Sequence, residues 1–150
     1  MTHPAFNDSL HRLMHAYKRQ LRAGIQQHHI SLPITHIRVL KAICRIPGVT
    51  ARDIAQRMDQ DKAQITRALN ELTRSGFIAR TPNPHDKRSQ LLAPTAEGQA
   101  LLSKIERLEQ QAVAQMTHNL DSQELASFVR IANIMIDNVA HSRPDSKGEQ

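Results

Sequence analysis

The sequence has little of what disulfide, zinc or base-stacking chemistry requires. Among its 150 residues there is one cysteine, Cys44, so the chain can form neither an internal disulfide nor a cysteine-based zinc site. Tryptophan is absent, and the aromatic residues are one tyrosine and three phenylalanines. That is too few for a surface that binds single-stranded nucleic acid by stacking its bases.

Long apolar runs and catalytic motifs are also missing. No stretch approaches the roughly 18 apolar residues that a membrane helix needs. The first ten residues lack the apolar core of a secretory signal, so we expect a cytoplasmic protein. There is no glycine-rich phosphate loop, nucleophile elbow or paired-carboxylate motif. We therefore predict that the chain is not an enzyme and needs no cofactor.

The chain contains enough apolar residues to form a hydrophobic core, and it has an excess of positive charge. Hydrophobic residues make up 39% of the sequence, and the formal net charge is +6. A net positive charge of this size favours a polyanionic partner, and nucleic acid is the first candidate. The alternative is a basic protein that has no such partner.

Apolar residues spaced by three and four positions predict helices in the first third of the chain. One helix is expected from about Phe6 to His28. Pro33 can occupy the first turn of a second helix, which Pro47 and Gly48 end.

Two short helices separated by a polar turn are predicted next. Thr50 opens the first of them, and Asp53 three residues later completes a variant of the capping box. The second follows Asp61 and runs to about Ser75, where Gly76 suits the left-handed residue that closes a helix.

The periodicity then changes to that of a hairpin. Residues 77–81 and 88–93 read as two strands joined by a proline-containing loop. Thr95 caps a long helix, and Asp121 or Ser122 begins a last one. The chain is thus predicted to be mainly α-helical, with one small β-hairpin.

We predict a single domain over residues 1–150, with a winged helix-turn-helix lobe at residues 33–95. The wing is the hairpin that follows the two short helices. Helices from both termini, at residues 1–32 and 96–141, are expected to form a dimerisation region. Residues 142–150 are polar and are expected to be a flexible tail.

The helix after Asp61 has the pattern of a recognition helix, with a narrow apolar face and a polar face that can enter the major groove. Gln64 can make a two-pronged contact with adenine, Arg67 with guanine, and Ala63 can lie against a thymine methyl group. The alternative for each residue is that it lies on a solvated face of the helix and makes no contact with DNA. The predicted recognition surface comprises Lys62, Ala63, Gln64, Thr66, Arg67 and Asn70.

Backbone contacts are predicted around this helix. Lys62 and Arg74 suit phosphates, as do Thr50 and Arg52 at the start of the preceding helix.

The hairpin carries cations that can enter the minor groove, namely Arg80, Lys87 and Arg88. Asp86 lies two residues before Arg88, and we expect it to buttress this arginine through an ion pair. The alternative is that Asp86 only caps the turn.

Three segments together resemble the MarR family of bacterial regulators. They are residues 69–80 (LNELTRSGFIAR), residues 84–88 (PHDKR) and residues 95–98 (TAEG). Asp86, Lys87 and Arg88 match the family's Asp-x-Arg wing motif, and residues 62–67 match the start of its recognition helix. The resemblance extends weakly over nearly the whole chain.

The resemblance implies an obligate dimer that controls transcription at a palindromic operator. In many members a small anionic or phenolic compound, bound between the two lobes, releases the DNA. Two positions depart from the pattern. Ile37 replaces a common aromatic residue, which puts a typical aromatic ligand pocket in doubt, and Pro94 replaces a common leucine.

The first helix and the last two have apolar stripes that are wider than a small winged lobe can cover. An isologous dimer would bury them and would place two recognition helices about one DNA turn apart. The alternative is that these helices pack only on their own subunit.

Other polar groups invite weaker hypotheses. His11 and His15, four apart on the first helix, could hold an anionic effector. His28, His29 and His36 lie near a helix junction, but without cysteine and with few nearby acids we predict no metal site. Cys44 lies on an apolar stripe, so we expect inert packing and no role as a peroxide sensor.

The sequence therefore predicts a dimeric, sequence-specific regulator of transcription, most simply a repressor, that binds double-stranded DNA and responds to an effector. A winged-helix module that binds another protein is the alternative.

Overall fold

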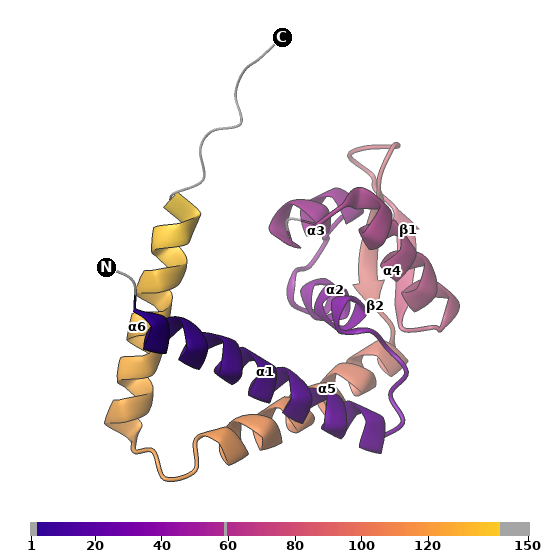
Figure 1. Ribbon diagram of the computed structural model, residues 1–150. Helices are drawn as coiled ribbons and strands as arrows, with labels where there is room; N and C mark the ends of the chain where they lie inside the picture. The colour runs from indigo at the N-terminus through magenta and orange to yellow at the C-terminus, as the bar shows by residue number, and fades with distance from the viewer. Residues whose placement is uncertain (1–2, 59, 142–150) are drawn as a thin grey trace. The chain divides into compact units, whose positions relative to one another are not determined.

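Along the described chain, helices α1 to α4 come first, a single hairpin follows, and helices α5 and α6 come last, which is the predicted order (Figure 1). The computed structural model describes residues 3–58 and 60–141, so the predicted tail at residues 142–150 lies outside the described part. The chain forms two compact units, residues 1–112 and 113–150. The elements are α1 (Pro4–Gln27), α2 (Ile34–Arg45), α3 (Ala51–Met58), α4 (Lys62–Arg74), β1 (Ile78–Pro82), β2 (Gln90–Pro94), α5 (Ala96–Met116) and α6 (Ser122–His141).

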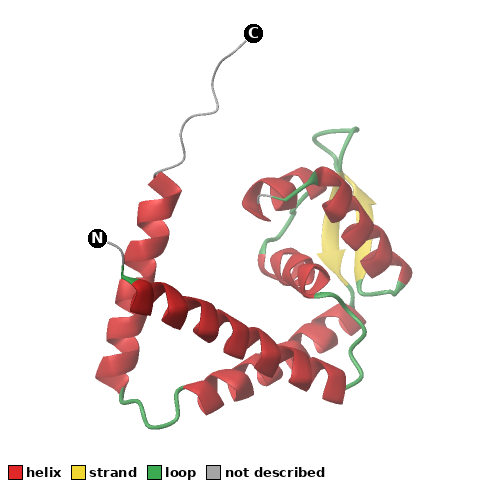
Figure 2. Ribbon diagram, in the orientation of Figure 1, coloured by secondary structure: helices red, strands yellow, loops and turns green. Residues whose placement is uncertain are grey.

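The predicted fold class is confirmed: the described chain is mainly helical, with one antiparallel pair of strands (Figure 2). Strand β1 pairs with β2 in a register that places Arg80 opposite Leu92. The strands lie one or two residues later than predicted, so Arg88 belongs to the loop of the wing and not to a strand. Pro33 precedes α2 as its cap residue and is not within its first turn.

Local hydrogen bonds explain where the short helices begin and end. The Thr50 backbone N–H donates to Asp53 Oδ2 at 2.9 Å, and the Asp53 N–H donates to Thr50 Oγ1 at 3.2 Å, which confirms the predicted capping box. Asp61 accepts a hydrogen bond from the Ala63 N–H and caps α4. Gly76 has a φ of +80°, which allows the chain to leave α4 sharply.

The core of the first unit holds α2, α3, α4 and the wing together. Val49 forms an isolated bridge with Leu92, and the Leu92 N–H donates to the Val49 carbonyl at 2.9 Å, so the base of the wing is tied to the start of α3. The buried residues of this core are Val39, Leu40, Ile43, Val49, Ile54, Ile65, Ala68, Leu69, Leu72, Ile78 and Leu92. This core orients α4 and the hairpin as one body.

A second cluster in the same unit joins α1, α2 and the first part of α5. It comprises Leu21, Ile25, Ile37, Ile105 and Leu108. Ile37, the residue that replaces a common aromatic, is buried here. Two ion pairs reinforce the packing of α2 against α5, Lys41 with Glu109 and Arg45 with Glu106.

The second unit begins in the last turn of α5 and continues into α6. Asp121 and Glu124 cap α6 reciprocally through hydrogen bonds of 2.9 and 2.8 Å. No residue of α6 is buried, although the helix is rich in isoleucine and valine. The unit boundary falls within α5, whereas the predicted division into lobes fell at residue 95. The functional division into lobes stays a prediction.

Candidate nucleic-acid interface

A groove lies between α4, the start of α3 and the wing, entirely within the first unit. Its cationic side chains are Arg52, Lys62, Arg80, Lys87 and Arg88. Among the described residues that line it, the one acid is Asp86. A concave surface lined by one sign of charge focuses its field outward and attracts the opposite charge.

The α4 helix divides into a buried and an exposed face, as a recognition helix requires. Ile65, Ala68, Leu69 and Leu72 are buried in the core. The predicted recognition residues Lys62, Ala63, Gln64, Thr66, Arg67 and Asn70 are all exposed. The apolar face anchors the helix, and the polar face is left on the surface.

Gln64 and Arg67 are free to bind a ligand. Neither side chain makes a hydrogen bond or ion pair with another residue of the described chain, and both are exposed. Thr66 differs, because its hydroxyl donates to the Lys62 carbonyl of its own helix at 2.9 Å. The methyl group of Thr66 and the acceptor lone pairs of its hydroxyl remain available.

Arg80 has a place that the sequence did not predict. It is half-buried on β1, away from the wing loop, and its Nη2 donates to Asn70 Oδ1 at 2.8 Å. Its Nε donates to Thr73 Oγ1 at 3.1 Å. Arg80 therefore ties the wing to α4, and Asn70 keeps only its amide N–H groups for a further partner. The contact joins residues ten apart on two different elements, and no local sequence pattern signals it.

The start of α3 presents Thr50 and Arg52 to the groove. The Thr50 hydroxyl oxygen accepts a hydrogen bond from the Asp53 N–H, so this side chain already takes part in the capping box. Hydrogen bonds from the Thr50 backbone, and then from its side chain, lower the pKa of Asp53. Arg74, the other predicted phosphate contact, is exposed at the end of α4, where its Nη2 lies 4.0 Å from Glu71.

The loop of the wing is built on two side chains that cap its turns. Asn83 Oδ1 accepts from the His85 N–H at 3.0 Å, and its Nδ2 donates to Ser89 Oγ at 2.9 Å. Asp86 Oδ1 accepts from the Arg88 backbone N–H at 2.9 Å. Asn and Asp commonly stabilise turns in this way.

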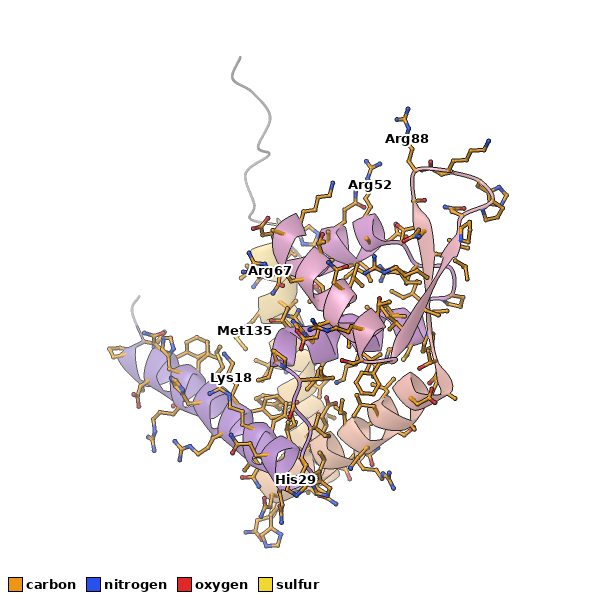
Figure 3. All side chains as sticks on the ribbon, turned by 90° about the vertical axis from the view of Figure 1, so that its right-hand side faces the viewer. Lys18, His29, Arg52, Arg67, Arg88 and Met135 are labelled. Atoms are coloured by element: carbon orange, nitrogen blue, oxygen red, sulfur yellow. The ribbon has the colours of Figure 1, made fainter. Side chains whose placement is uncertain are left out.

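The geometry of Asp86 corresponds to the capping alternative. No ion pair between the Asp86 and Arg88 side chains occurs in the described part of the chain, so the expected ion-pair buttress is absent and Asp86 contacts only the main chain of Arg88. The guanidinium of Arg88 is exposed, as is the side chain of Lys87. Figure 3 shows Arg52, Arg67 and Arg88 pointing outward from three different elements of the lobe.

The remaining polar groups lie away from this groove. His11 and His15 are exposed on α1; a shallow hollow there includes His15 but not His11. Within residues 3–58 and 60–141, no three His, Cys, Asp or Glu side chains cluster as metal ligands. Cys44 is half-buried, and burial, with Glu106 second, raises the pKa of its thiol. No helix of the described chain is long and apolar enough to cross a membrane.

These observations define a class of protein. A pair of short helices whose second member has an open polar face, followed by a cationic hairpin, is a winged helix-turn-helix.

Comparison with known proteins places the chain within that class. A model of the MarR family matches residues 30–89. The multiple antibiotic resistance protein MarR of Escherichia coli is 30% identical over 132 residues, which cover 85% of this chain and 92% of the relative. An HTH-type transcriptional regulator of Bacillus subtilis, YwhA, is 27% identical over 123 residues, covering 79% of this chain and 88% of the relative.

Solved structures agree with this fold. A mutant of E. coli MarR complexed with operator DNA superposes with a TM-score of 0.69 at 25% identity, covering 85% of this chain and 93% of that one. Streptococcus pneumoniae FabT in complex with DNA gives a TM-score of 0.78 at 17% identity, covering 93% and 98%. The chain belongs to the MarR family of transcriptional regulators and not to a family of enzymes.

Proposed function

We propose that this chain is a homodimeric repressor that binds a palindromic operator in double-stranded DNA and is released by a small anionic or phenolic effector. The observation that carries the proposal is that α4 contributes Lys62 and Thr66 to a cationic groove that it shares with Arg88 of the wing. Gln64 and Arg67 do not line that groove, but they lie on the exposed face of the same helix without a side-chain partner in the described chain. The MarR mutant that superposes on this chain is complexed with operator DNA, which supports the same use of the groove.

Each side chain of the candidate interface is assigned a role by its chemistry. Gln64 and Arg67 read adenine and guanine in the major groove, and Ala63 lies against a thymine methyl group. Arg88 and Lys87 enter the minor groove. The phosphate contacts come from Lys62, Arg74, Thr50 and Arg52, while Arg80 and Asn70 hold the wing in place beside α4.

Dimerisation is supported by apolar surface that each unit leaves open. Phe6, Leu10 and Met14 of α1 are 52%, 39% and 46% exposed, and Ile136 and Val139 of α6 are 62% and 69% exposed. Apolar surface of this extent on two terminal helices is typical of a protein interface. A two-fold dimer would pair these surfaces and would repeat the recognition helix for inverted half-sites. Such a dimer would repress transcription where its operator overlaps a promoter.

Recovery of bound DNA fragments from the genome tests the proposal most directly. We expect the fragments to share an inverted repeat, and a duplex that carries it to be bound in a mobility-shift assay in preference to a scrambled duplex. Binding should weaken steeply with salt, because several phosphates are neutralised. Weak and equal binding to all duplexes would contradict operator recognition and would favour the alternative of a wing that binds protein.

Effector release is tested separately on the operator complex. Benzoate and 4-hydroxybenzoate serve as anionic and phenolic probes, and we expect either to lower operator occupancy in the wild-type protein. His11→Ala and His15→Ala should each weaken that response, and His11→Ala should leave binding to the operator without effector unchanged. If neither probe changes occupancy or melting temperature, this part of the proposal fails and operator binding stands.

A further inference from the structure

One face of α1 has a row of basic side chains that operator reading by α4 and the wing does not use. Arg12, His15, Arg19 and Arg22 are spaced by three, four and three residues, which places them on one side of the helix, with Lys18 beside them. All five side chains are exposed. We call these residues the α1 cationic face. From Arg12 to Arg22 the face is about 15 Å long.

The α1 cationic face lacks the acids that usually accompany lysine and arginine on a solvated helix. The sequence has no aspartate or glutamate between Asp8 and Asp53. Asp8 lies 3.8 Å from Arg12, whereas Lys18, Arg19 and Arg22 form no ion pair within the described chain. Like charges at these spacings repel and destabilise a helix slightly, so helix stability does not account for the row.

No other described element covers this face. Two shallow hollows lie along it, and both are lined by side chains of α1 alone. The first includes Arg12, His15 and Arg19, and the second includes Lys18, Arg19 and Arg22. Of the exposed residues that we assign to the dimer, Phe6 and Leu10 lie on the opposite side of the helix, and Met14 lies one turn before Lys18 at the edge of the face. A dimer built on these residues leaves Arg12, Arg19 and Arg22 open.

A second copy of the chain is a poor occupant for the face, because most described carboxylates already cap helices, close turns or form ion pairs. Asp53, Asp61, Asp86 and Glu109 are examples. Duplex DNA, in contrast, presents about one negative charge per 1.7 Å of its axis, and arginine and lysine are its usual phosphate contacts.

We propose that the α1 cationic face binds the phosphodiester backbone of double-stranded DNA, as a contact additional to the recognition helix and the wing. The inference rests on the proposed function, since it assigns a second DNA-binding surface to a chain that binds DNA. It requires no base recognition, so the contact adds affinity on every duplex and does not change which sequence is preferred.

The test compares two doubly substituted full-length proteins that lose the same charge. Arg19→Gln with Arg22→Gln removes two cations from the face, and Lys104→Gln with Arg107→Gln removes two from α5. Binding to an operator duplex and to a random duplex of about 30 base pairs, three helical turns, is measured by fluorescence anisotropy from about 50 to 200 mM salt. Circular dichroism and sedimentation confirm that both variants keep the wild-type fold and mass.

Because both subunits of the dimer lose two cations, we expect the α1 variant to lower the slope of log affinity against log salt by about 3.6 on both duplexes. The ratio of variant to wild-type Kd should then grow about a hundredfold as the salt falls from about 200 to 50 mM, while the α5 variant tracks the wild type. An unchanged slope in the α1 variant overturns the inference, as does an equal loss in both variants. The inference is also overturned if the α1 variant binds both duplexes like the wild type but loses binding to phosphatidylglycerol vesicles or to polyglutamate. In each case preference for the operator over the random duplex still reports on the proposed function independently.

Discussion

Residues of the candidate interface differ in whether the fold uses their polar atoms. Gln64, Arg67 and Arg88 have no side-chain partner in the described chain. Asn70 and Arg80, by contrast, hold each other across α4 and β1. Substitution of a free residue should therefore change DNA binding with little effect on stability, whereas substitution of Arg80 should change both.

The Arg88→Ala variant tests the minor-groove assignment. Removing an exposed guanidinium from the wing loop should weaken operator binding by about 1–3 kcal/mol, most strongly when the flanks are A·T-rich. Fluorescence anisotropy on operators with A·T and G·C flanks measures both effects, and the melting temperature should not change. Unchanged affinity on both flanks would exclude the wing from the mechanism.

Gln64→Ala and Arg67→Ala test base reading by α4. Each loss should relax the preference at one base pair of the half-site, because a two-pronged contact contributes about 1–3 kcal/mol of discrimination. Affinities for operators substituted at single positions measure this preference. Lys62→Ala is the matched control on the same helix, and it should weaken all duplexes alike. A uniform loss for Gln64→Ala or Arg67→Ala would instead identify a phosphate contact.

At the scale of elements, the join between the wing and α5 depends on one close approach. The Thr95 N–H donates to the Phe77 carbonyl at 3.0 Å, and Thr95 Oγ1 accepts from the Gly98 N–H at 3.1 Å. A Cβ atom on Gly98 would lie 2.0 Å from that same Phe77 carbonyl oxygen. Glycine is needed here because two main chains are in contact, and not because of an unusual φ angle.

Gly98→Ala should therefore destabilise the protein by about 3 kcal/mol, because the start of α5 must move away from β1. Chemical unfolding measures the change. Gly24→Ala is the control: its Cβ would lie 3.5 Å from Leu108 Cδ2, an ordinary contact inside a helix. That substitution should stabilise the protein by about 0.5–1 kcal/mol. Equal effects from both substitutions would refute the close approach at Gly98.

The capping box of α3 makes part of the stability depend on acid pH. The pKa of Asp53 is lowered, first by the Thr50 backbone hydrogen bond and second by the Thr50 side chain. A lowered folded-state pKa means that this contribution is present above the ordinary pKa of aspartate and is lost as the pH falls through the folded value. Asp53→Asn should reduce the difference in stability measured between about pH 5 and pH 2. An Asp53 pKa at the ordinary value of aspartate in an NMR titration would contradict the assigned cause. Thr50→Ala removes only the side-chain contribution, so it should raise this pKa part of the way and leave the effect of the backbone hydrogen bond.

At the scale of the whole molecule, the surface of α6 is the strongest indication of assembly. Its residues include Phe128 and Ile131, which are 54% and 45% exposed, and none is buried. A helix of this composition is stable in water when its apolar side is covered. We therefore expect the stability of the folded protein to increase with protein concentration.

Phe128→Glu combined with Ile131→Glu should convert the dimer into a monomer and lower affinity for a palindromic operator. Sedimentation equilibrium measures the mass, and thermal unfolding of the wild type should shift upward with concentration. Gln123→Glu combined with Asn133→Glu adds the same charge to polar positions of α6 and should leave the dimer intact. A wild type that sediments as a monomer at micromolar concentration would refute the dimer.

Prediction from sequence worked where the signal is local. The capping residues Thr50, Asp53 and Thr95 and the helix-closing Gly76 act on residues within a few positions of themselves, so composition and spacing reveal them. The two faces of α4 follow from the same helical spacing. The strand limits were displaced by one or two residues, because pairing with the opposite strand, and not local preference, decides where a strand begins.

The amino-acid sequence by itself determined the order of helices and hairpin, the residues on the open side of α4 and the sign of the charge beside it. Only the folded chain decided that Arg80 ties the hairpin to α4, that Asp86 holds the main chain of Arg88, and that Gly98 must lack a side chain. The physical reason is distance along the chain. A helix or a cap depends on neighbours a few residues away, whereas the direction of a side chain between two elements depends on packing that brings separate segments together.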